Sequence, residues 1–562
     1  MSVVSAFKKR LALPVTSWQI CLLAIICGFA AALLLVLFQI TIENIQHFYS
    51  SEAFQYISID WLSRFQIPIL AVVFILLLSR VTGYQYIRSG IPFVLHRLKV
   101  AYGAMPFRNT LNQFFGGAFA IASGFSVGKE GPSVHLGSAS ASFLASRLHL
   151  PYNAIRTLSA CGIAAGISAV FNTPIAAVVF VMEVILREYK VHIFIPVMLA
   201  SIVGSVVTSS LLGNEHSFTF FAELELDLIF YPLLIIFGAV LGTFASGFNH
   251  YLAKTIERFQ HWHIFNRLLV AALITGALSH LVPNGMLNDI GSIQNAIDNQ
   301  WQFQVLAVFL LVKVLMTIAA IGLGIPGGVI GPILMIGALT GMCGSFIAGH
   351  FLPAGEHIAS DLAILGMAGF MAATLNAPLA ALLAVVELSR QLEIIVPAMI
   401  VITVACLVAG QMFGNRSIFI MQLNVQKLAY RKSPVENSLQ GIGVLGSLRN
   451  QLTLTESADN NQARYHLANN DNNALIINQY QNHERQNCFE WLSFDDKVPA
   501  QEIVVRQALL PLSSQATLAE AYLALKDKRQ GGVYIYQRDQ SDIIGVILFR
   551  DIQAYLQEGK IS

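Results

Sequence analysis

Two Gly/Pro turns recur at matching places in the two halves of the chain and limit the folds that it can adopt. The first is Gly128–Pro132 (GKEGP) and the second is Gly328–Pro332 (GVIGP), at a spacing of 200 residues. A second pair, FNTPIAA at 171–177 and LNAPLAA at 375–381, recurs at a spacing of 204 and continues to matching acids, Glu183 and Glu387. Apolar segments broken at matching Gly/Pro positions are typical of membrane proteins built from two repeats, whose binding site lies between half-helix ends.

The composition agrees with a membrane protein. Apolar residues make up 55% of the chain and charged residues 12%, and a soluble chain would carry roughly twice that charge. Ten apolar stretches have lengths that scatter around the roughly 20 residues that cross a bilayer squarely. They are Ser17–Ile40, Ile67–Leu78, Ala154–Val184, Phe194–Leu212, Leu226–Phe248, Leu268–Leu281, Val305–Leu323, Ile330–Phe351, Leu362–Leu388 and Val396–Phe413. We therefore predict an all-α polytopic membrane protein with strongly tilted and partly re-entrant helices.

The chain is expected to divide into five parts. These are a cytoplasmic N-terminus (1–16), a first membrane repeat (17–212), a polar inter-repeat loop (213–225), a second membrane repeat (226–432) and a cytoplasmic α/β tail (433–562). The tail holds 26 of the charged residues in 130 positions, against 40 in the preceding 432. Within it, periodicity predicts a helix, two strands and a helix at Leu518–Lys526, Gly532–Tyr536, Ile543–Leu548 and Asp551–Leu556. The Asn/Gln-rich stretch Asn460–Asn487 reads as a mobile insertion around one strand at Ala474–Ile477.

The distribution of charged residues predicts the orientation of the chain in the membrane. The net charge and the cysteines limit the classes of partner that it is expected to bind. Lys8, Lys9 and Arg10 precede the first apolar segment, and Arg431 and Lys432 follow the last, so both termini are expected in the cytoplasm. A net charge of +2 argues against nucleic acid as a partner. The six cysteines lack metal-ligand spacing, and the chain shows neither paired catalytic acids nor a phosphate loop. We expect no enzyme, no metal and no cofactor.

Of the two turns, only the first contains an ionisable residue, Glu130. Pro132 suits the first position of a helix, so the turn should open one. The free backbone N–H groups there attract an anion, and the helix dipole adds up to about 2 kcal/mol. An ionised carboxylate would itself occupy that position and would leave it when protonated or displaced. A simple capping acid is the alternative, but flanking apolar segments favour a functional acid.

Three other features accompany this turn. Ser89 precedes Gly90-Ile91-Pro92 and offers a hydroxyl at another helix start, where an ordinary N-cap is the alternative. The second turn contributes amides without a charged side chain, as expected for a dehydrated anion. His135 follows Glu130 by five residues. A lone helical histidine is usually a packed or capping residue, although its titration near neutral pH could tune Glu130.

Taken in order along 17–432, these motifs resemble the CLC family of chloride channels and chloride/proton exchangers. The resemblance implies a CLC-type inverted repeat, a homodimer with one pore per subunit, and passage of chloride and other halides through the lipid bilayer. It implies that Glu130 is the gating glutamate and that Ser89 contacts the central chloride. It further assigns chloride-binding backbone amides to Lys129, Glu130, Gly131, Val329, Ile330 and Gly331.

The tail resembles the paired CBS domains that follow the membrane part in many members of this family. Asp551 then matches the acid that often meets the ribose of an adenine nucleotide. The threonine usual three residues before that acid is Leu548 here, which argues against nucleotide binding. Bacterial inner membrane is the expected location.

Departures from the family pattern bear on mechanism. Phe419 stands where a tyrosine usually gives the central site a second hydroxyl, and Ile330 stands where phenylalanine is usual. Exchangers carry an internal proton glutamate as the second of two acids, but here Val184 follows Glu183. The substitution favours a passive, Glu130-gated, pH-sensitive chloride channel, because a proton cannot cross apolar packing without a polar or ionisable group.

Two further classes stay open. The first is a chloride/proton antiporter that uses Glu183 or trapped water in place of the missing acid. Remote alternatives are a fluoride exporter, which the retained Ser89 disfavours, and an organic-solute carrier, for which the chain shows no motif.

Overall fold

The computed structural model describes twelve segments of the chain, and all structural statements below concern them. They are residues 3–50, 63–83, 90–213, 228–282, 301–351, 358–428, 432–456, 459–470, 474–481, 487–494, 503–537 and 539–558. The chain forms two compact units. One comprises Cys21–Leu144 and Thr157–Tyr430, and the other comprises Met1–Ile20, Ala145–Arg156 and Arg431–Ser562.

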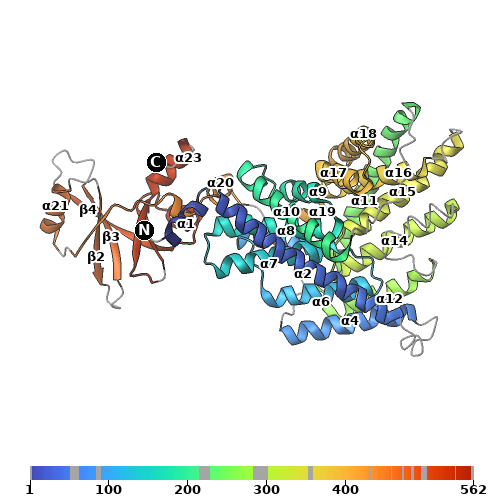
Figure 1. The fold of residues 1–562 in the computed structure, drawn as a ribbon, viewed down its shortest axis with the longest axis horizontal. Helices are drawn as coiled ribbons and strands as arrows, with labels where there is room; N and C mark the ends of the chain where they lie inside the picture. The colour runs from blue at the N-terminus through green and yellow to red at the C-terminus, as the bar shows by residue number, and fades with distance from the viewer. Residues whose placement is uncertain are drawn as a thin grey trace. The chain divides into compact units, whose positions relative to one another are not determined.

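The larger unit is helical and follows the duplicated sequence (Figure 1). The first repeat contains α2 (Trp18–Ser50), α4 (Ser63–Thr82), α5 (Gly90–Val100), α6 (Phe107–Ala122), α7 (Glu130–Arg147), α8 (Tyr152–Phe171), α9 (Pro174–Phe180), the π-helical η1 (Val181–Leu186) and α10 (Val191–Leu212). The second contains η2 (Leu228–Phe230), α11 (Tyr231–Phe259), α12 (Ile264–Ser279), α14 (Phe303–Leu323), α15 (Ile330–Phe351), α16 (Ala359–Leu375), α17 (Pro378–Ser389), α18 (Ile395–Leu407) and the π-helical η3 (Val408–Met412). A last short helix, α19 (Ile418–Val425), follows.

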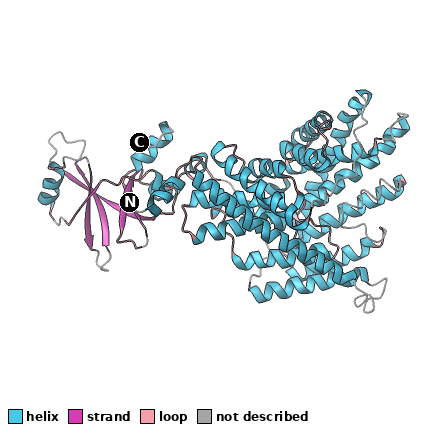
Figure 2. Cartoon of the chain, viewed as in Figure 1, coloured by secondary structure: helices cyan, strands magenta, loops and turns pink. Residues whose placement is uncertain are grey.

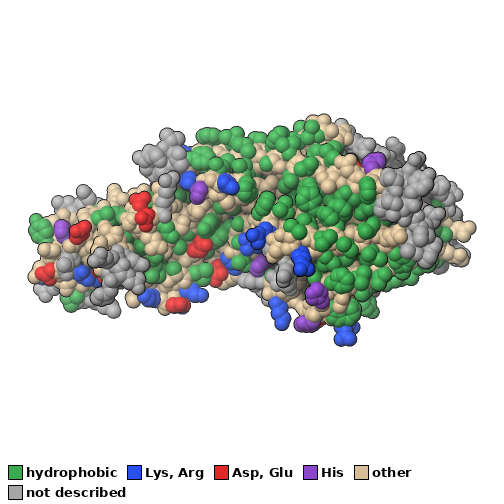
Figure 3. Space-filling model, turned by 90° about the horizontal axis from the view of Figure 1, so that it is seen from below, with side chains coloured by type: hydrophobic (Ala, Val, Ile, Leu, Met, Phe, Trp, Pro, Cys, Tyr) green, Lys and Arg blue, Asp and Glu red, His purple; other side chains and the backbone are tan. Residues whose placement is uncertain are grey.

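Helix length and composition make this unit a membrane domain. Among the described residues, eight helices are long and apolar enough to span a bilayer, and shorter apolar helices such as α12, α16 and α17 lie between them. Figure 3 shows hydrophobic side chains over much of the visible face of the helical part. The predicted all-α polytopic fold is confirmed. Residues 214–225 of the predicted inter-repeat loop lie outside the described residues.

Glycines allow two matching helix pairs to touch through their backbones. Gly137 of α7 meets Gly162 of α8, and Gly337 of α15 meets Gly366 of α16. A Cβ atom at Gly162 would lie 2.9 Å from the carbonyl carbon of Gly137, and one at Gly366 would lie 3.0 Å from that of Gly337. Lipid tails are as apolar as leucine, so close backbone approach is a main source of helix association in a membrane.

The two repeats also exchange helix caps. Glu183, in η1, accepts hydrogen bonds from the backbone N–H groups of Leu379 (3.3 Å) and Ala380 (2.7 Å) at the start of α17. Glu387, in α17, accepts from those of Ile175 (2.9 Å) and Ala176 (2.7 Å) at the start of α9. The first N–H groups of a helix have no partner within it. Each repeat therefore supplies the acceptor that the other repeat lacks.

The smaller unit contains all the strands in the described part of the chain (Figure 2). Its strands are β1 (Leu452–Thr455), β2 (Leu475–Gln481), β3 (Asn487–Phe494), β4 (Val504–Ser513), β5 (Gly532–Tyr536) and β6 (Ile543–Leu548). Its helices are α1 (Val3–Ala12), α20 (Pro434–Leu439), α21 (Asn460–Ala468), α22 (Leu518–Leu525) and α23 (Phe549–Glu558), with the 3₁₀ turn η4 (Val444–Gly446). The sheet runs β1-β2-β3-β4-β5-β6, with parallel pairs β1/β2 and β4/β5 and antiparallel pairs elsewhere. This order gives two βαββ halves.

The last four elements of the tail, α22, β5, β6 and α23, confirm the predicted helix–strand–strand–helix order. The strand predicted at Ala474–Ile477 is confirmed as β2, but the prediction of a mobile insertion around it is wrong at its start, where α21 (Asn460–Ala468) forms. Ala463 of α21 forms a small buried cluster with Ile476 of β2 and Leu492 of β3, and Leu467 of α21 packs against it, so the helix lies on the sheet. The Asn-rich composition of the stretch made these few apolar positions hard to recognise as part of a helix in the sequence.

The smaller unit also includes the N-terminal helix and the connection between α7 and α8. The backbone N–H of Gly443 donates to the carbonyl of Ala12 at 2.8 Å, and Asn153 Nδ2 donates to the carbonyl of Leu11 at 3.0 Å. The expected division at 16/17 and 432/433 thus omits a contribution from Ala145–Arg156 to this unit. Residues from both ends of the chain pack in it, and the cytoplasmic location of the ends stays a prediction.

We expect the substitution Gly366→Ala to lower the free energy of unfolding by at least about 2 kcal/mol, since its Cβ would press on the backbone of α15. The matched control is Gly247→Ala in α11, where a Cβ would meet nothing within 4 Å. Thermal unfolding of the purified protein in detergent measures both. Equal stabilities of the two variants would contradict close contact between α15 and α16.

Candidate functional site

The two Gly/Pro turns lie side by side and are joined by backbone hydrogen bonds. The N–H of Gly128 donates to the carbonyl of Gly328 at 2.8 Å, and the N–H of Gly328 donates to that of Gly128 at 2.8 Å. This is an isolated antiparallel bridge between the repeats. α7 and α15 each begin two residues beyond it, so two helix N-termini start from one point in the fold.

The side chain of Glu130 connects these helix starts. It is only 2% exposed, and its carboxylate accepts hydrogen bonds from its own backbone N–H and from that of Gly331 in α15, where a Cβ would lie 2.9 Å from Oε1. Its Oε2 atom has no hydrogen-bond partner among the described residues, and a Cβ at Gly328 would lie 2.6 Å from it. The acid therefore does more than cap its own helix, because it occupies the anion-attracting start of a helix from the other repeat.

The residues around Glu130 contribute backbone atoms rather than side chains to this site. Lys129 is exposed, and its carbonyl accepts the Ser133 N–H at 3.0 Å and the Ser133 hydroxyl at 2.7 Å. Gly131 packs so closely on the second turn that a Cβ would lie 2.6 Å from the carbonyl oxygen of Gly327. Only glycine fits there. Val329 and Ile330 are buried on the facing turn.

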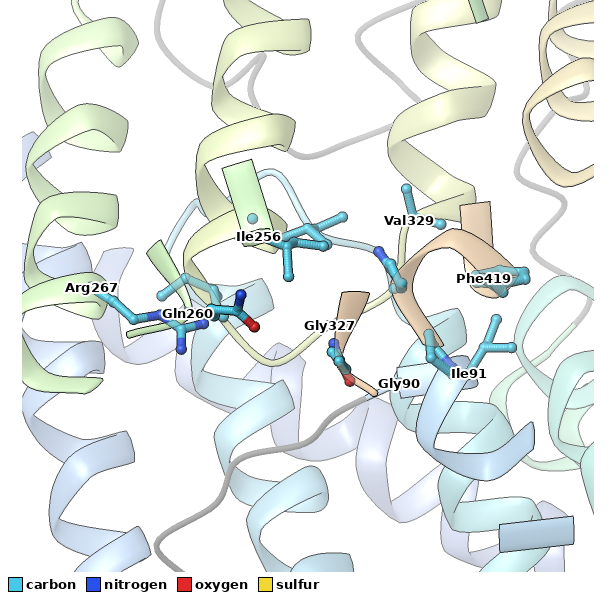
Figure 4. Close-up of a pocket in the computed structure, with 16 residues that line it drawn as sticks. Gly90, Ile91, Ile256, Gln260, Arg267, Gly327, Val329 and Phe419 are labelled. Atoms are coloured by element: carbon cyan, nitrogen blue, oxygen red, sulfur yellow. The ribbon is translucent and has the colours of Figure 1, made fainter. Parts of the chain in front are cut away.

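A cavity of about 120 Å³ adjoins the second turn (Figure 4). The start of α5 contributes Gly90 and Ile91, the turn contributes Gly328 and Val329, and the start of α19 contributes Phe419. Three helix N-termini therefore border one cavity, and such termini attract anions. The remaining lining residues are Pro92, Ile256, Gln260, Arg267, Ile321, Gly322, Gly324, Ile325, Gly327, Gln422 and Gln426.

The residues expected to contact the central anion are only partly described. Phe419 is 2% exposed and lines the cavity, so this wall lacks a hydroxyl. Ser89 lies outside the described residues, and its successor Gly90 lines the cavity. Their roles in chloride binding stay predictions.

The two residues at the expected proton-path position differ in setting. Val184 is 3% exposed and offers no proton acceptor. Glu183 is half-buried, and both of its carboxylate oxygens accept backbone N–H groups of α17. Glu387 has the same bonding pattern at the matching place in the second repeat. The arrangement favours a capping role for Glu183.

His135 is fully buried in α7. Its Nε2 lies 3.2 Å from the hydroxyl of Thr110, and its ring stacks on Phe93 with centroids 5.8 Å apart. Its Nδ1 has no hydrogen-bond partner within the described ranges. These contacts favour the interpretation of His135 as a packed residue.

Asp551, the nucleotide candidate, is engaged within its own unit. Its carboxylate pairs with Arg449 at 2.5 and 3.1 Å and accepts the backbone N–H of Leu548 at 3.1 Å. A ribose would have to displace Arg449. Across the described segments, no group of three or more His, Cys, Asp or Glu residues could hold a metal ion.

Sequence reasoning missed Arg267, Gln260 and Gln422 as lining residues of the cavity. Arg267 immediately precedes the apolar segment that begins at Leu268, so it resembled an ordinary flanking charge. Gln260 follows α11, Arg267 lies in α12 and Gln422 lies in α19, and such single residues share no spacing in the sequence. Only the fold brings them together.

Comparison with known proteins shows which family this chain matches. The sequence model of the family described as voltage gated chloride channel matches residues 70–410. The chain is 26% identical over 438 residues to the H(+)/Cl(-) exchange transporter ClcA of Vibrio campbellii, covering 75% of this chain and 92% of that one. It is 29% identical over 330 residues to the putative chloride channel protein ClcB-like of Ralstonia nicotianae, covering 57% and 76%.

Solved structures share the fold. A slow cyanobacterial Cl⁻/H⁺ antiporter superposes with a TM-score of 0.65 at 22% identity, covering 73% of this chain and 98% of its own. A eukaryotic CLC transporter superposes with a TM-score of 0.61 at 19% identity, covering 95% and 97%. With its paired Gly/Pro turns, its repeated helices and a family match over more than half of its length, this chain belongs to the voltage gated chloride channel (CLC) family.

Proposed function

We propose that this protein is a chloride/proton antiporter of the membrane. In this proposal the proton binds the carboxylate of Glu130, and the anion competes with that carboxylate for one position. The observation that carries the proposal is the buried carboxylate of Glu130 on the amide of Gly331, at a helix start that attracts anions. An ionised carboxylate and a chloride compete for that position. Protonation removes the charge of the carboxylate, so proton binding and chloride binding at the site are linked.

The relatives support coupled exchange over the passive channel that Val184 favours. The matching Vibrio proteins carry the name of exchange transporters, and a solved neighbour is a Cl⁻/H⁺ antiporter. Passive flow remains the second candidate because Val184, 3% exposed, gives a proton no acceptor at the expected place.

A coupled mechanism needs a proton route that avoids Val184. We propose that water in the cavity beside Gly328 and Val329 supplies it, since about 120 Å³ exceeds the ~30 Å³ share of one water several-fold. Amides and glutamine side chains line that cavity and can hold such water. Glu183 is the less suitable route, because its carboxylate holds the start of α17.

We further propose a homodimer in the bilayer. α10 exposes Phe194, Met198, Ile202 and Val206 along one face, and α18 exposes Val396 and Met399. Apolar faces of this kind suit either lipid or a second copy of the chain. Chloride and other halides are the proposed cargo, and no nucleotide is required for transport.

The test of exchange is proton movement in liposomes under an imposed chloride gradient. The wild-type protein should drive protons uphill, and Glu130→Gln should reduce proton movement to the level of protein-free liposomes. Chloride flux through Glu130→Gln should persist, rise above wild type and lose its pH dependence, because the amide cannot take up the proton. Chloride flux without proton movement in the wild type would favour the channel. An unchanged Glu130→Gln would remove Glu130 from the mechanism.

A second pair of variants asks whether Glu183 carries protons. Glu183→Gln and the matched Glu387→Gln should each cost about 1 kcal/mol of stability, because each removes a charge from a helix start. Both should keep the wild-type ratio of protons to chloride. The measurements are thermal unfolding in detergent and coupled flux in liposomes. Loss of proton movement in Glu183→Gln alone would assign the proton route to Glu183.

A further inference from the structure

The connection between α11 and α12 carries basic and aromatic side chains at one end of the membrane unit. Both helices are apolar, and α11 is long enough to span a bilayer, so we expect the short connection at the membrane surface. Lys254 and Arg258 are exposed on one face of α11, and exposed Trp262 follows in the connection. The ring of Trp262 packs against that of Phe259, with centroids 4.8 Å apart, so its position is fixed.

The end of α4 lies at the same end of the unit. Arg64, at the start of α4, donates hydrogen bonds to the carbonyl groups of Ser279 and Val282, which stand at the end of α12 and just beyond it. The two helices pack on each other, so they are antiparallel. The end of α4, with exposed Arg80, therefore lies beside the start of α12.

The start of α6 adds a third arginine. Arg108 is the second residue of α6 and is exposed, and a Cβ at Gly83, just beyond the end of α4, would lie 3.6 Å from its Nη1. Figure 3 shows Lys, Arg and His side chains gathered along the lower edge of the helical part, next to hydrophobic surface. We call Arg80, Arg108 and Arg258, with the apolar side chains around them, the basic patch.

The three arginines have little negative charge around them. None of them forms an ion pair within the described part of the chain. Over the segments that form this end of the unit, residues 77–83, 107–112 and 254–267, the sequence contains a single acid, Glu257. A guanidinium stays protonated at any ordinary pH, so the patch is permanently positive.

Large apolar side chains surround the arginines. Val81 and Phe107 are 84% and 67% exposed, and each is adjacent in sequence to one of the arginines. Trp262 and Phe265 are about half exposed in and after the connection. At a membrane surface such side chains reach the acyl chains, while arginines extend toward the headgroups. A ligand with an anionic head and apolar chains matches both kinds of side chain.

We propose that the basic patch binds an anionic phospholipid, of the phosphatidylglycerol type, from the surrounding bilayer. Guanidinium groups bind phosphate oxygens in a planar, bidentate way, and the three arginines supply three of them. Trp262 and Phe265 contact the acyl chains next to the headgroup. The dimer proposed above uses α10 and α18, and neither helix carries a residue of the patch, so the patch stays open to lipid. This site does not depend on how chloride transport is coupled.

Tryptophan fluorescence of the full-length protein in detergent micelles tests the site, because brominated acyl chains quench an indole that they touch. The signal of Trp262 is the difference between the wild type and Trp262→Phe, which removes one of the five tryptophans. Brominated phosphatidylglycerol should quench this signal at a mole fraction at least about tenfold lower than brominated phosphatidylcholine does, because each basic side chain near the surface adds about fivefold attraction to anionic lipid.

Charge variants assign the preference to the patch. The triple variant Arg80→Gln/Arg108→Gln/Arg258→Gln should bring phosphatidylglycerol to within about twofold of phosphatidylcholine and leave quenching by phosphatidylcholine unchanged, and Arg258→Gln alone should weaken phosphatidylglycerol about three- to fivefold. The matched control Arg390→Gln removes an exposed arginine at the end of α17, two residues before exposed Leu392, and should keep the wild-type preference. If the triple variant does not fold, Arg258→Gln against Arg390→Gln decides the matter.

Ionic strength and a soluble headgroup distinguish a lipid from a free phosphate compound. Added salt should reduce the preference of the wild type for phosphatidylglycerol and leave the triple variant unaffected, because salt screens exposed charges. Glycerol phosphate in excess over the lipid should leave the quenching in place, because it lacks the acyl chains that Trp262 and Phe265 contact. Recovery of fluorescence with glycerol phosphate would assign the patch to a soluble phosphate compound and overturn the lipid site.

Three further results would overturn the lipid site. Equal quenching of the wild type by the two lipids would do so, as would an unchanged preference in the triple variant. Absence of quenching by either lipid would show that protein, such as a second copy of the chain, covers Trp262. An equal loss of preference in Arg390→Gln and Arg258→Gln would show a general effect of net charge. Chloride flux in liposomes tests the proposed function separately, so failure of one leaves the other standing.

Discussion

The paired hydrogen bonds between Gly128 and Gly328 hold the two Gly/Pro turns together, and the rest of the membrane unit depends on this contact. They join turns from the two repeats, and α7 and α15 begin directly after them. Helix starts carry unpaired N–H groups and partial positive charge, and the bilayer offers no water to satisfy them. A site that attracts anions follows from the backbone alone, and we propose that the Glu130 carboxylate competes with an anion for it.

The need to satisfy the N–H groups at helix starts also explains how the two repeats depend on each other. Glu183 caps a helix of the second repeat and Glu387 caps a helix of the first, so neither repeat satisfies its own backbone without the other. A carboxylate in an apolar setting is costly unless it is fully hydrogen-bonded. In Glu183 and in Glu387 both carboxylate oxygens accept a backbone N–H group, whereas Oε2 of Glu130 has no protein partner in the described segments. That difference supports the proposal that Glu183 and Glu387 are structural acids and that Glu130 is the functional one.

Much of this could be read from the sequence, and the misses have physical causes. The spacing of the turns predicts a chain built from two repeats, and local periodicity predicts the last four elements of the tail. The match of Glu183 with Glu387 was visible, but its meaning as an exchange of caps depends on contacts about 200 residues apart. Arg267 and Gln422 carry no shared spacing, so only tertiary structure reveals their cavity. A helix in the Asn-rich stretch was missed because only two of its apolar residues, Ala463 and Leu467, pack on the sheet.

The central claim is that the Glu130 carboxylate and a halide compete for one position at the start of α15. Anomalous diffraction from crystals of wild-type protein and of Glu130→Gln, both grown in bromide, tests it most directly. The account predicts a bromide peak beside the Gly331 amide that is strong in Glu130→Gln and weak or absent in the wild type. Equal bromide occupancy in both proteins, or no bromide near that helix start in either, would contradict it.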